Sequence, residues 1–214
     1  GTAASVASTD AECGASPELR RGTERVTHGA SARPWLAPLG WAYGAAVEVA
    51  RRWRQSIGGV TRLDIPVVSV GNLTVGGTGK GPVVRWVVER LMARGAHPAI
   101  ALRGYRAGPQ GSDEALEHAE LLPGVPLSVG ADRIRAIGEV RSAHREIDCV
   151  VLDDGFQHWR LARDLDLVLI DATRPGLDEA MLPAGSRREW RSALRRADGV
   201  IVTRAERVDE ELAL

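Results

Sequence analysis

The feature that most constrains this chain is a glycine-rich segment, Thr74-Val75-Gly76-Gly77-Thr78-Gly79-Lys80, which holds its only lysine. Every other residue among the 28 basic ones is arginine. An ammonium group is a compact point charge that fits between nucleotide phosphates, where a planar guanidinium would not. A β-branched run at 65–70 precedes the segment, and a helical pattern at 82–94 follows it. Strand, turn and helix in this order predict a phosphate-binding loop at a helix N-terminus.

The rest of the chain alternates apolar runs with helical patterns. We expect strands at 99–102, 125–129, 149–152, 167–170 and 199–202, and helices at 113–122 and 131–143. Strands that are apolar throughout are buried on both faces, as in parallel sheets covered by helices. The sequence therefore predicts an α/β fold of the P-loop NTPase kind, with a mainly parallel sheet and helices on both faces.

Composition limits the partners. Acidic and basic residues number 28 each, so the formal net charge is zero, and we expect no nucleic-acid partner. The two cysteines have no metal-ligand spacing, which favours a reducing cytoplasm. Residues 1–33 lack apolar periodicity, which predicts a disordered leader before a helix at 34–57 and a kinase domain at 58–214.

The segment 34–57 is predicted to be an amphipathic helix. Apolar or small residues recur at helical spacing, at Trp35, Leu39, Ala42, Ala46, Val49 and Trp53. Arginines follow at 51, 52 and 54, and the segment is too short and too charged to span a bilayer. Such a helix either lies in a membrane interface or packs on the core of its own domain. The residues alone leave both interpretations open.

The glycine-rich loop departs from the standard pattern at two positions. Thr74 stands where that pattern begins with glycine. The residue after the lysine is normally Ser or Thr, whose hydroxyl binds Mg²⁺, and here it is Gly81. We expect weaker metal positioning with phosphate binding retained, and Thr78 is the nearest alternative hydroxyl.

Two acidic residues follow a buried strand. Asp153 and Asp154 come directly after the run at 149–152, and therefore at the carboxyl edge of the sheet, where ligands bind in α/β folds. In P-loop proteins an acid at this place holds Mg²⁺ directly or through water. The sequence thus predicts ATP and Mg²⁺ as the cofactors of one site.

The sequence motifs around these positions resemble those of the tetraacyldisaccharide 4'-kinase family, which phosphorylates a lipid disaccharide in the lipid A pathway. The loop at 67–80 carries the resemblance, which extends from about Trp35 to Thr203. The other matching motifs, in order, are Arg103-Gly104-Tyr105, Ser112-Asp113-Glu114, Val129-Gly130-Ala131-Asp132-Arg133, Asp153-Asp154-Gly155-Phe156-Gln157-His158 and Leu182-Pro183-Ala184-Gly185. The resemblance implies transfer of the γ-phosphate of ATP to the 4'-hydroxyl of a tetraacyldisaccharide 1-phosphate.

The resemblance also implies roles for the matching residues. The ATP phosphates would be bound by Thr74, Val75, Gly76, Gly77, Thr78, Gly79, Lys80 and Gly81. Asp113 would be the general base toward the sugar hydroxyl, and its alternative role is a helix N-cap. Asp153 and Asp154 would position Mg²⁺ and, with Lys80, complete the catalytic set.

Further matching residues would bind the acceptor. Gln157 and His158 would lie near the disaccharide, although His158 is also consistent with a surface histidine. Arg133 and Arg188 would bind the lipid phosphate by bidentate hydrogen bonds, unless they are simply solvated arginines.

The family places its N-terminal segment on the cytoplasmic face of the bacterial inner membrane, which favours the interfacial interpretation of residues 34–54. Its members also carry a C-terminal lobe that we expect to be absent from these residues. A nucleotide-binding remnant without turnover is therefore the alternative to the kinase, and Gly81 favours it. A regulatory GTPase is a distant third possibility, based on a faint likeness of residues 203–206 to a guanine-binding motif.

Overall fold

The computed structural model describes residues 34–57, 59–104 and 112–207. The predicted leader at 1–33 and Tyr105 of the Arg-Gly-Tyr motif lie outside these residues. Six strands form one parallel sheet in the order β3-β2-β4-β1-β5-β6. They are β1 (Val67–Asn72), β2 (Pro98–Leu102), β3 (Leu127–Val129), β4 (Cys149–Asp153), β5 (Leu165–Asp171) and β6 (Gly199–Thr203).

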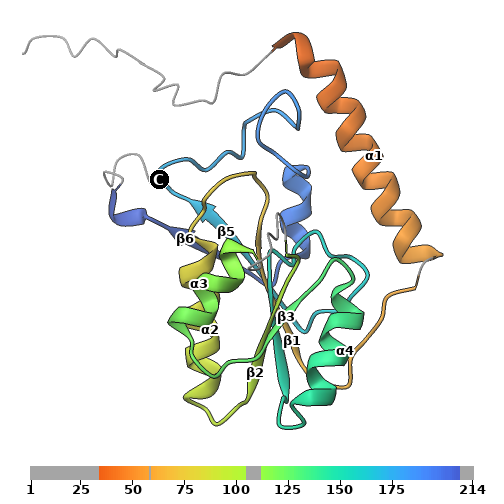
Figure 1. The fold of residues 1–214 in the computed structure, drawn as a ribbon. Coiled ribbons are helices and arrows are strands. Elements are labelled where there is room, and N and C mark those ends of the chain that lie inside the picture. Colours follow the sequence, from red (N-terminus) through yellow and green to blue (C-terminus); the bar gives the residue numbers. More distant parts are fainter. Residues whose placement is uncertain (1–33, 58, 105–111, 208–214) are drawn as a thin grey trace, which may run out of the picture.

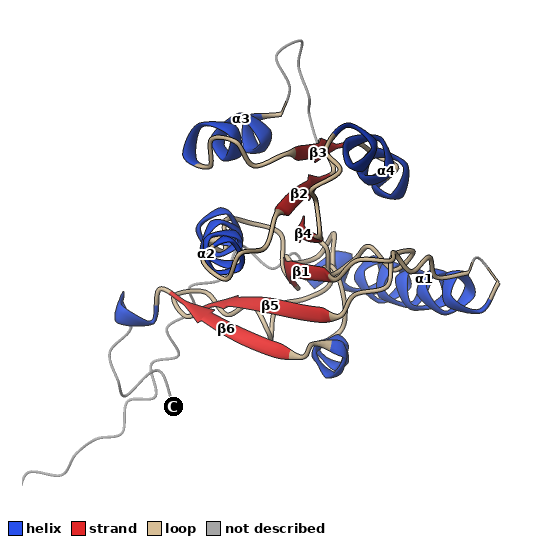
Figure 2. Ribbon diagram, turned by 90° about the horizontal axis from the view of Figure 1, so that it is seen from below, coloured by secondary structure: helices blue, strands red, loops and turns tan. Residues whose placement is uncertain are grey.

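Helices cover both faces of the sheet. Figure 2 shows α2 and α3 on one side, and α1, α4 and the short helix η2 on the other. The α-helices are α1 (Ala37–Ser56), α2 (Lys80–Met92), α3 (Asp113–Leu121) and α4 (Arg133–Ala143). Three 3₁₀ turns complete the structure: η1 (Pro34–Leu36), η2 (Arg191–Arg196) and η3 (Ala205–Arg207). The predicted α/β fold is confirmed.

The core explains why these residues form these elements. Val84, Val87 and Val88 lie one helical turn apart on α2 and are buried against Val70 and Ile100 of the sheet. A second cluster, around Ile137 and Leu152, lies beneath α4 on the other face. Burial of each such side chain contributes about 1.5–3 kcal/mol, so the continuous apolar runs are stable only between two helical layers.

Several predicted boundaries are wrong by two residues, and two of these shifts affect the site. Strand β1 spans Val67–Asn72 rather than 65–70, because Pro66 has no N–H for the ladder while pairing with β5 continues as far as Asn72. Helix α2 begins at Lys80 rather than residue 82, because the phosphate loop leads directly into its first turn. Both shifts bring polar side chains to the carboxyl edge of the sheet, where Val70 pairs with Asp153.

Helix α1 lies at the side of the sheet, as Figure 1 shows. Its predicted apolar stripe is exposed: Trp35 is 73%, Leu39 56% and Trp53 58% accessible. The helix contacts the domain through a different face, where Gly40 and Gly44 are buried. The apolar stripe is therefore not packed on the domain core, and the interfacial interpretation stays a prediction. No described helix combines the length and the apolar character that crossing a bilayer requires.

Candidate functional site

Lys80 lies at the end of the phosphate loop, where helix α2 begins. It is the first residue of α2, after Gly79, which caps the helix at a φ of 77°. Its Nζ lies 3.4 Å from Oδ1 of Asn72 and 3.5 Å from Oδ1 of Asp154. The lysine thus joins the loop to the ends of β1 and β4, and its ammonium group stands at the N-terminus of α2, where anions bind.

Asn72 and Thr203 hold the loop in place from the ends of β1 and β6, which lie on either side of β5 in the sheet. The buried Asn72 donates from Nδ2 to Oγ1 of Thr78 over 3.0 Å. The hydroxyl of Thr203 donates to the backbone oxygen of Thr78 over 2.9 Å. The Thr78 hydroxyl is therefore turned inward, toward Asn72. Sequence reasoning missed Asn72 and Thr203, although a polar residue that ends an apolar strand was an available signal.

Asp154 is the most highly connected acid of the site. Its backbone is left-handed, with a φ of 54°, and its Oδ1 lies near Lys80 at the end of the loop. Arg188 donates to its Oδ2 over 2.6 Å, and the buried Arg133 donates to its backbone oxygen over 3.0 Å. Burial alone would raise the pKa of Asp154, but the charges of Lys80 and Arg188 outweigh burial and lower that pKa.

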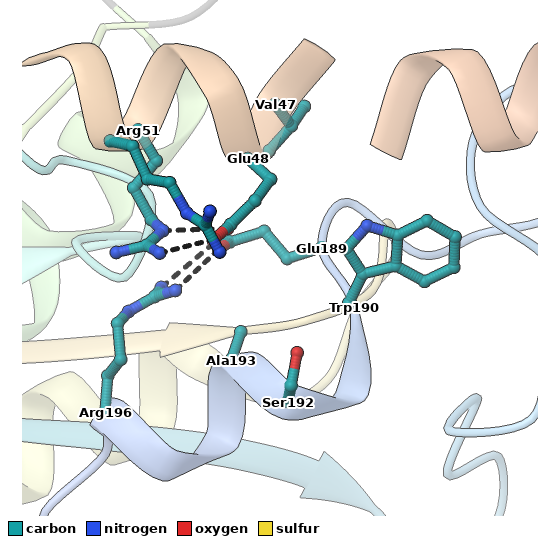
Figure 3. A pocket seen from close by; sticks show the side chains of 9 residues that line it. Val47, Glu48, Arg51, Glu189, Trp190, Ser192, Ala193 and Arg196 are labelled. Atoms are coloured by element: carbon teal, nitrogen blue, oxygen red, sulfur yellow. Dashed lines mark hydrogen bonds and ion pairs between the residues drawn. The ribbon is translucent and has the colours of Figure 1, made fainter. Parts of the chain in front are cut away.

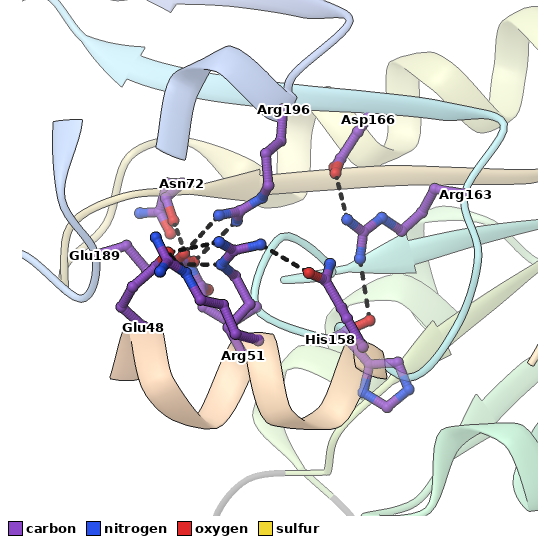
Figure 4. A network of polar contacts seen from close by, with 11 residues as sticks. Glu48, Arg51, Asn72, His158, Arg163, Asp166, Glu189 and Arg196 are labelled. Atoms are coloured by element: carbon purple, nitrogen blue, oxygen red, sulfur yellow. Dashed lines mark hydrogen bonds and ion pairs between the residues drawn. The ribbon is translucent and has the colours of Figure 1, made fainter. Parts of the chain in front are cut away.

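Gln157 joins the same network. Its Nε2 donates to the backbone oxygen of Asn72 over 2.9 Å, and its Oε1 accepts from Arg188 over 3.3 Å. The structure thus brings together Lys80, Asp154, Gln157, Arg133 and Arg188, which the sequence could place only in separate motifs. Figure 4 shows the wider set of polar contacts in which Asn72 and His158 lie.

His158 is half-buried rather than fully exposed. Burial, followed by the nearby charges of Arg133 and Arg163, lowers the pKa of its imidazole from 6.5 to about 4. Its Nε2 is buried without a hydrogen-bond partner among the described residues. A neutral ring with an unpartnered nitrogen suits a polar ligand group, and the role toward the disaccharide stays a prediction.

The acidic helix α3 differs from expectation at its first turn. Ser112 is the N-cap, and its Oγ accepts from the backbone N–H of Ala115 over 3.3 Å, so the alternative of Asp113 as the cap is wrong. Asp113 is the exposed first residue of the helix, and its role as base stays a prediction. Glu114 is also exposed, but partial burial, and then the charge of Asp153, raises the pKa of its carboxyl group.

Asp153 is buried at the end of β4, where its Oδ2 lies 3.0 Å from Nε2 of His118. Among the described residues, no group of three or more histidine, cysteine or acidic side chains could hold a metal without other ligands. Mg²⁺ in nucleotide sites is held by one or two carboxylates together with phosphate oxygens and water. Asp153 and Asp154, at a strand end beside the phosphate loop, fit that kind of site.

A hollow of about 250 Å³ lies away from the phosphate loop, between α1 and η2 (Figure 3). Paired charges line it: Arg51 donates to Glu48, and Arg196 donates to Glu189. Glu189 of this hollow directly follows Arg188 of the site in the chain. Within residues 203–206, which faintly resemble a guanine-binding motif, Arg204 pairs with Asp171.

A phosphate loop at the carboxyl edge of a parallel sheet, beside strand-end acids, defines a P-loop NTPase-like protein. Residues 32–213 match the LpxK family, described as tetraacyldisaccharide-1-P 4'-kinase, and the chain belongs to that family.

Similar proteins are known by sequence and by structure. The tetraacyldisaccharide 4'-kinase of Geobacter sulfurreducens is 41% identical over 76% of this chain and 51% of its own length. That of Azoarcus sp. is 42% identical over 78% of this chain and 52% of its own. The crystal structure of LpxK from Aquifex aeolicus in complex with ATP has a TM-score of 0.71 and 30% identity, and covers 81% of this chain and 59% of that one. The chain therefore spans about half the length of the curated relatives that it matches.

Proposed function

We propose that this chain is an ATP-dependent kinase that transfers the γ-phosphate to the 4'-hydroxyl of a tetraacyldisaccharide 1-phosphate in lipid A biosynthesis. The observation that carries the proposal is the position of Lys80 Nζ, within 3.5 Å of both Asn72 Oδ1 and Asp154 Oδ1 at the sheet edge. This places one positive charge between the phosphate loop and the acids, where it can bind the phosphates during phosphoryl transfer. Family membership and the similarity to an ATP-bound structure support the same conclusion.

The residues divide into two groups by chemistry. The N–H groups of the loop 74–81 and the ammonium of Lys80 would bind the β- and γ-phosphates, while Asp153 and Asp154 would hold Mg²⁺ and its water. The metal would neutralise charge that develops on the transferred group. Asp113 would accept the proton of the attacking sugar hydroxyl, because that oxygen becomes a good nucleophile only as its proton leaves.

The lipid disaccharide acceptor would bind against basic and polar side chains. Arg133, Arg188, Gln157 and His158 surround Asp154 or adjoin it. Arg188 is already paired with Asp154, so a phosphate of the lipid would have to share or displace that contact. These four residues are the proposed contacts of the disaccharide and its phosphate.

The direct test uses the whole chain with Mg·ATP and a tetraacyldisaccharide 1-phosphate in detergent, with product detected as a 4'-phosphorylated lipid. We expect product with ATP, little with GTP, and a loss of at least about a hundredfold in Lys80→Ala. Exposed Arg90→Ala on the same helix is the matched control and should retain full activity. Nucleotide binding without product would refute the kinase and leave the non-catalytic alternative.

We further propose that α1 holds the protein on the cytoplasmic face of the bacterial inner membrane, beside its acylated substrate. Its exposed apolar stripe is followed by Arg52 and Arg54, both exposed, which suits an anionic lipid surface.

Vesicle flotation tests this proposal. Replacing Trp35, Leu39 and Trp53 with Ser should release the protein from anionic vesicles. Trp53 is chosen because Trp41 contacts the ring of Trp190, with centroids 4.9 Å apart. The matched control replaces three apolar side chains of similar exposure elsewhere: Trp86, Met92 and Leu121. Equal loss in both triple variants, or no loss in the first, would refute an interfacial role for α1.

A further inference from the structure

His118 is a buried histidine to which the proposed mechanism assigns no role. It lies in the second turn of α3, and only 2% of its side chain is accessible. Its Nε2 is 3.0 Å from Oδ2 of Asp153, whose side chain is 6% accessible. The two residues are 35 positions apart in the chain, and their side chains meet beside the phosphate loop.

The hydrogen bond to Asp153 is the imidazole's only one within the described part of the chain, because Nδ1 is buried without a partner. The carboxylate can only accept, so Nε2 carries the proton and donates it. A polar ring at an otherwise apolar position costs free energy unless its contact offsets that cost. An aliphatic side chain at position 118 would fill the same space without that cost. The hydrogen bond to Asp153 is what a histidine adds there.

The helix that carries His118 is capped at its N-terminus by Ser112, and its backbone hydrogen bonds continue to Leu122, whose N–H donates to the backbone oxygen of His118. Glu117 accepts from Arg85 of α2 over 2.7 Å. The imidazole is therefore presented to Asp153 from a fixed frame, as precise positioning of a ligand requires.

Gly81 makes such positioning more important. The usual hydroxyl ligand is missing there, and Thr78 is turned toward Asn72. Orientation of a metal–nucleotide complex then depends chiefly on the strand-end acids. His118 occupies one oxygen of Asp153, which prevents free rotation of the carboxylate and leaves the other oxygen for a metal-bound water.

We propose that His118 is a positioning residue that orients Asp153 and thereby strengthens Mg²⁺-dependent nucleotide binding. The inference rests on the proposed nucleotide site but not on turnover of any lipid.

The experiment compares His118→Leu, which fills the space without a donor, with His118→Gln, whose amide nitrogen can take the place of Nε2. ATP binding is measured by calorimetry in excess Mg²⁺ and again in EDTA. We expect the Mg²⁺-dependent gain in affinity to fall about tenfold in His118→Leu, as for a lost hydrogen bond to a charged group, and to be largely restored in His118→Gln. Affinity in EDTA should change less than about twofold in either variant, because Asp153 then has no metal to orient.

A double-mutant cycle provides the specific control. If His118 acts through Asp153, adding His118→Leu to Asp153→Ala should cause no further loss of the Mg²⁺-dependent gain. If His118→Leu does not fold, His118→Asn replaces it, because its amide is too short to reach Oδ2. Equal Mg²⁺ dependence in the wild type and in the Leu or Asn variant would overturn the inference while leaving the nucleotide site intact. A wild type that binds no ATP would instead refute the proposed function together with it.

Discussion

Gly44→Ala tests the docking of α1 on the domain. A Cβ at this position would lie 2.5 Å from Cζ2 and 2.7 Å from Cε2 of Trp190. Since carbon atoms pack at about 3.5 Å, the ring or the helix must move by about 1 Å. Overpacking of this kind costs about 1–3 kcal/mol. The better helix propensity of alanine offsets about 1 kcal/mol of this cost. We therefore expect the free energy of unfolding of Gly44→Ala to fall by up to about 2 kcal/mol.

Gly138→Ala is the matched control, because Gly138 also lies inside a helix but has nothing within 4 Å of the added Cβ. It should gain the propensity term alone, about 1 kcal/mol. The difference between the two variants in urea unfolding therefore isolates the clash, and should be about 1–3 kcal/mol. Amide hydrogen exchange over 37–56 should quicken only in Gly44→Ala. If both variants gain equally and α1 exchanges no faster, the helix does not lie against Trp190.

Two further predictions concern the site. Gly81→Thr should raise Mg²⁺-dependent phosphate transfer by about tenfold or more, because the added Cβ lies at ordinary distances, 3.4 Å from Arg85 Nη1 and 3.6 Å from Glu117 Oε1, and the hydroxyl restores a metal ligand; an unchanged rate and Mg²⁺ affinity would contradict this. His158 should make the fold acid-sensitive: its pKa is about 4 when folded against 6.5 when unfolded, so the unfolded chain binds the extra proton in that window. The unfolding free energy should then fall by about 2–3 kcal/mol between pH 6.5 and 4, and His158→Gln should flatten that slope in pH-dependent urea unfolding.

The alternation of short apolar runs with helical patterns was sufficient to predict the sheet, because strands buried on both faces are apolar throughout. The phosphate loop could be predicted for a similar local reason: glycines, the lone lysine and the flanking elements are contiguous. Element boundaries were less accurate, since the end of β1 depends on how far β5 pairs with it. Asn72, which forms part of the site, was missed for that reason.

Contacts between distant segments were beyond local reasoning. Three contacts of the site join residues that are 35, 34 and 125 positions apart in the chain. They are His118 with Asp153, Arg188 with Asp154, and Thr203 with Thr78. Nothing in the spacing of α3 marks His118 as anything but a core position. The face on which α1 docks was likewise concealed, because glycines carry no apolar signal, yet they allow the close approach of Trp190.

By itself, the sequence determined that this protein folds as a parallel α/β sheet with a phosphate loop and strand-end acids, because those features depend on side-chain period and on neighbours in the chain. Only the tertiary structure decided which side chains surround the acids and which face of α1 remains exposed. The physical reason is that packing and charge pairing act over a few ångströms in space, regardless of separation in the chain.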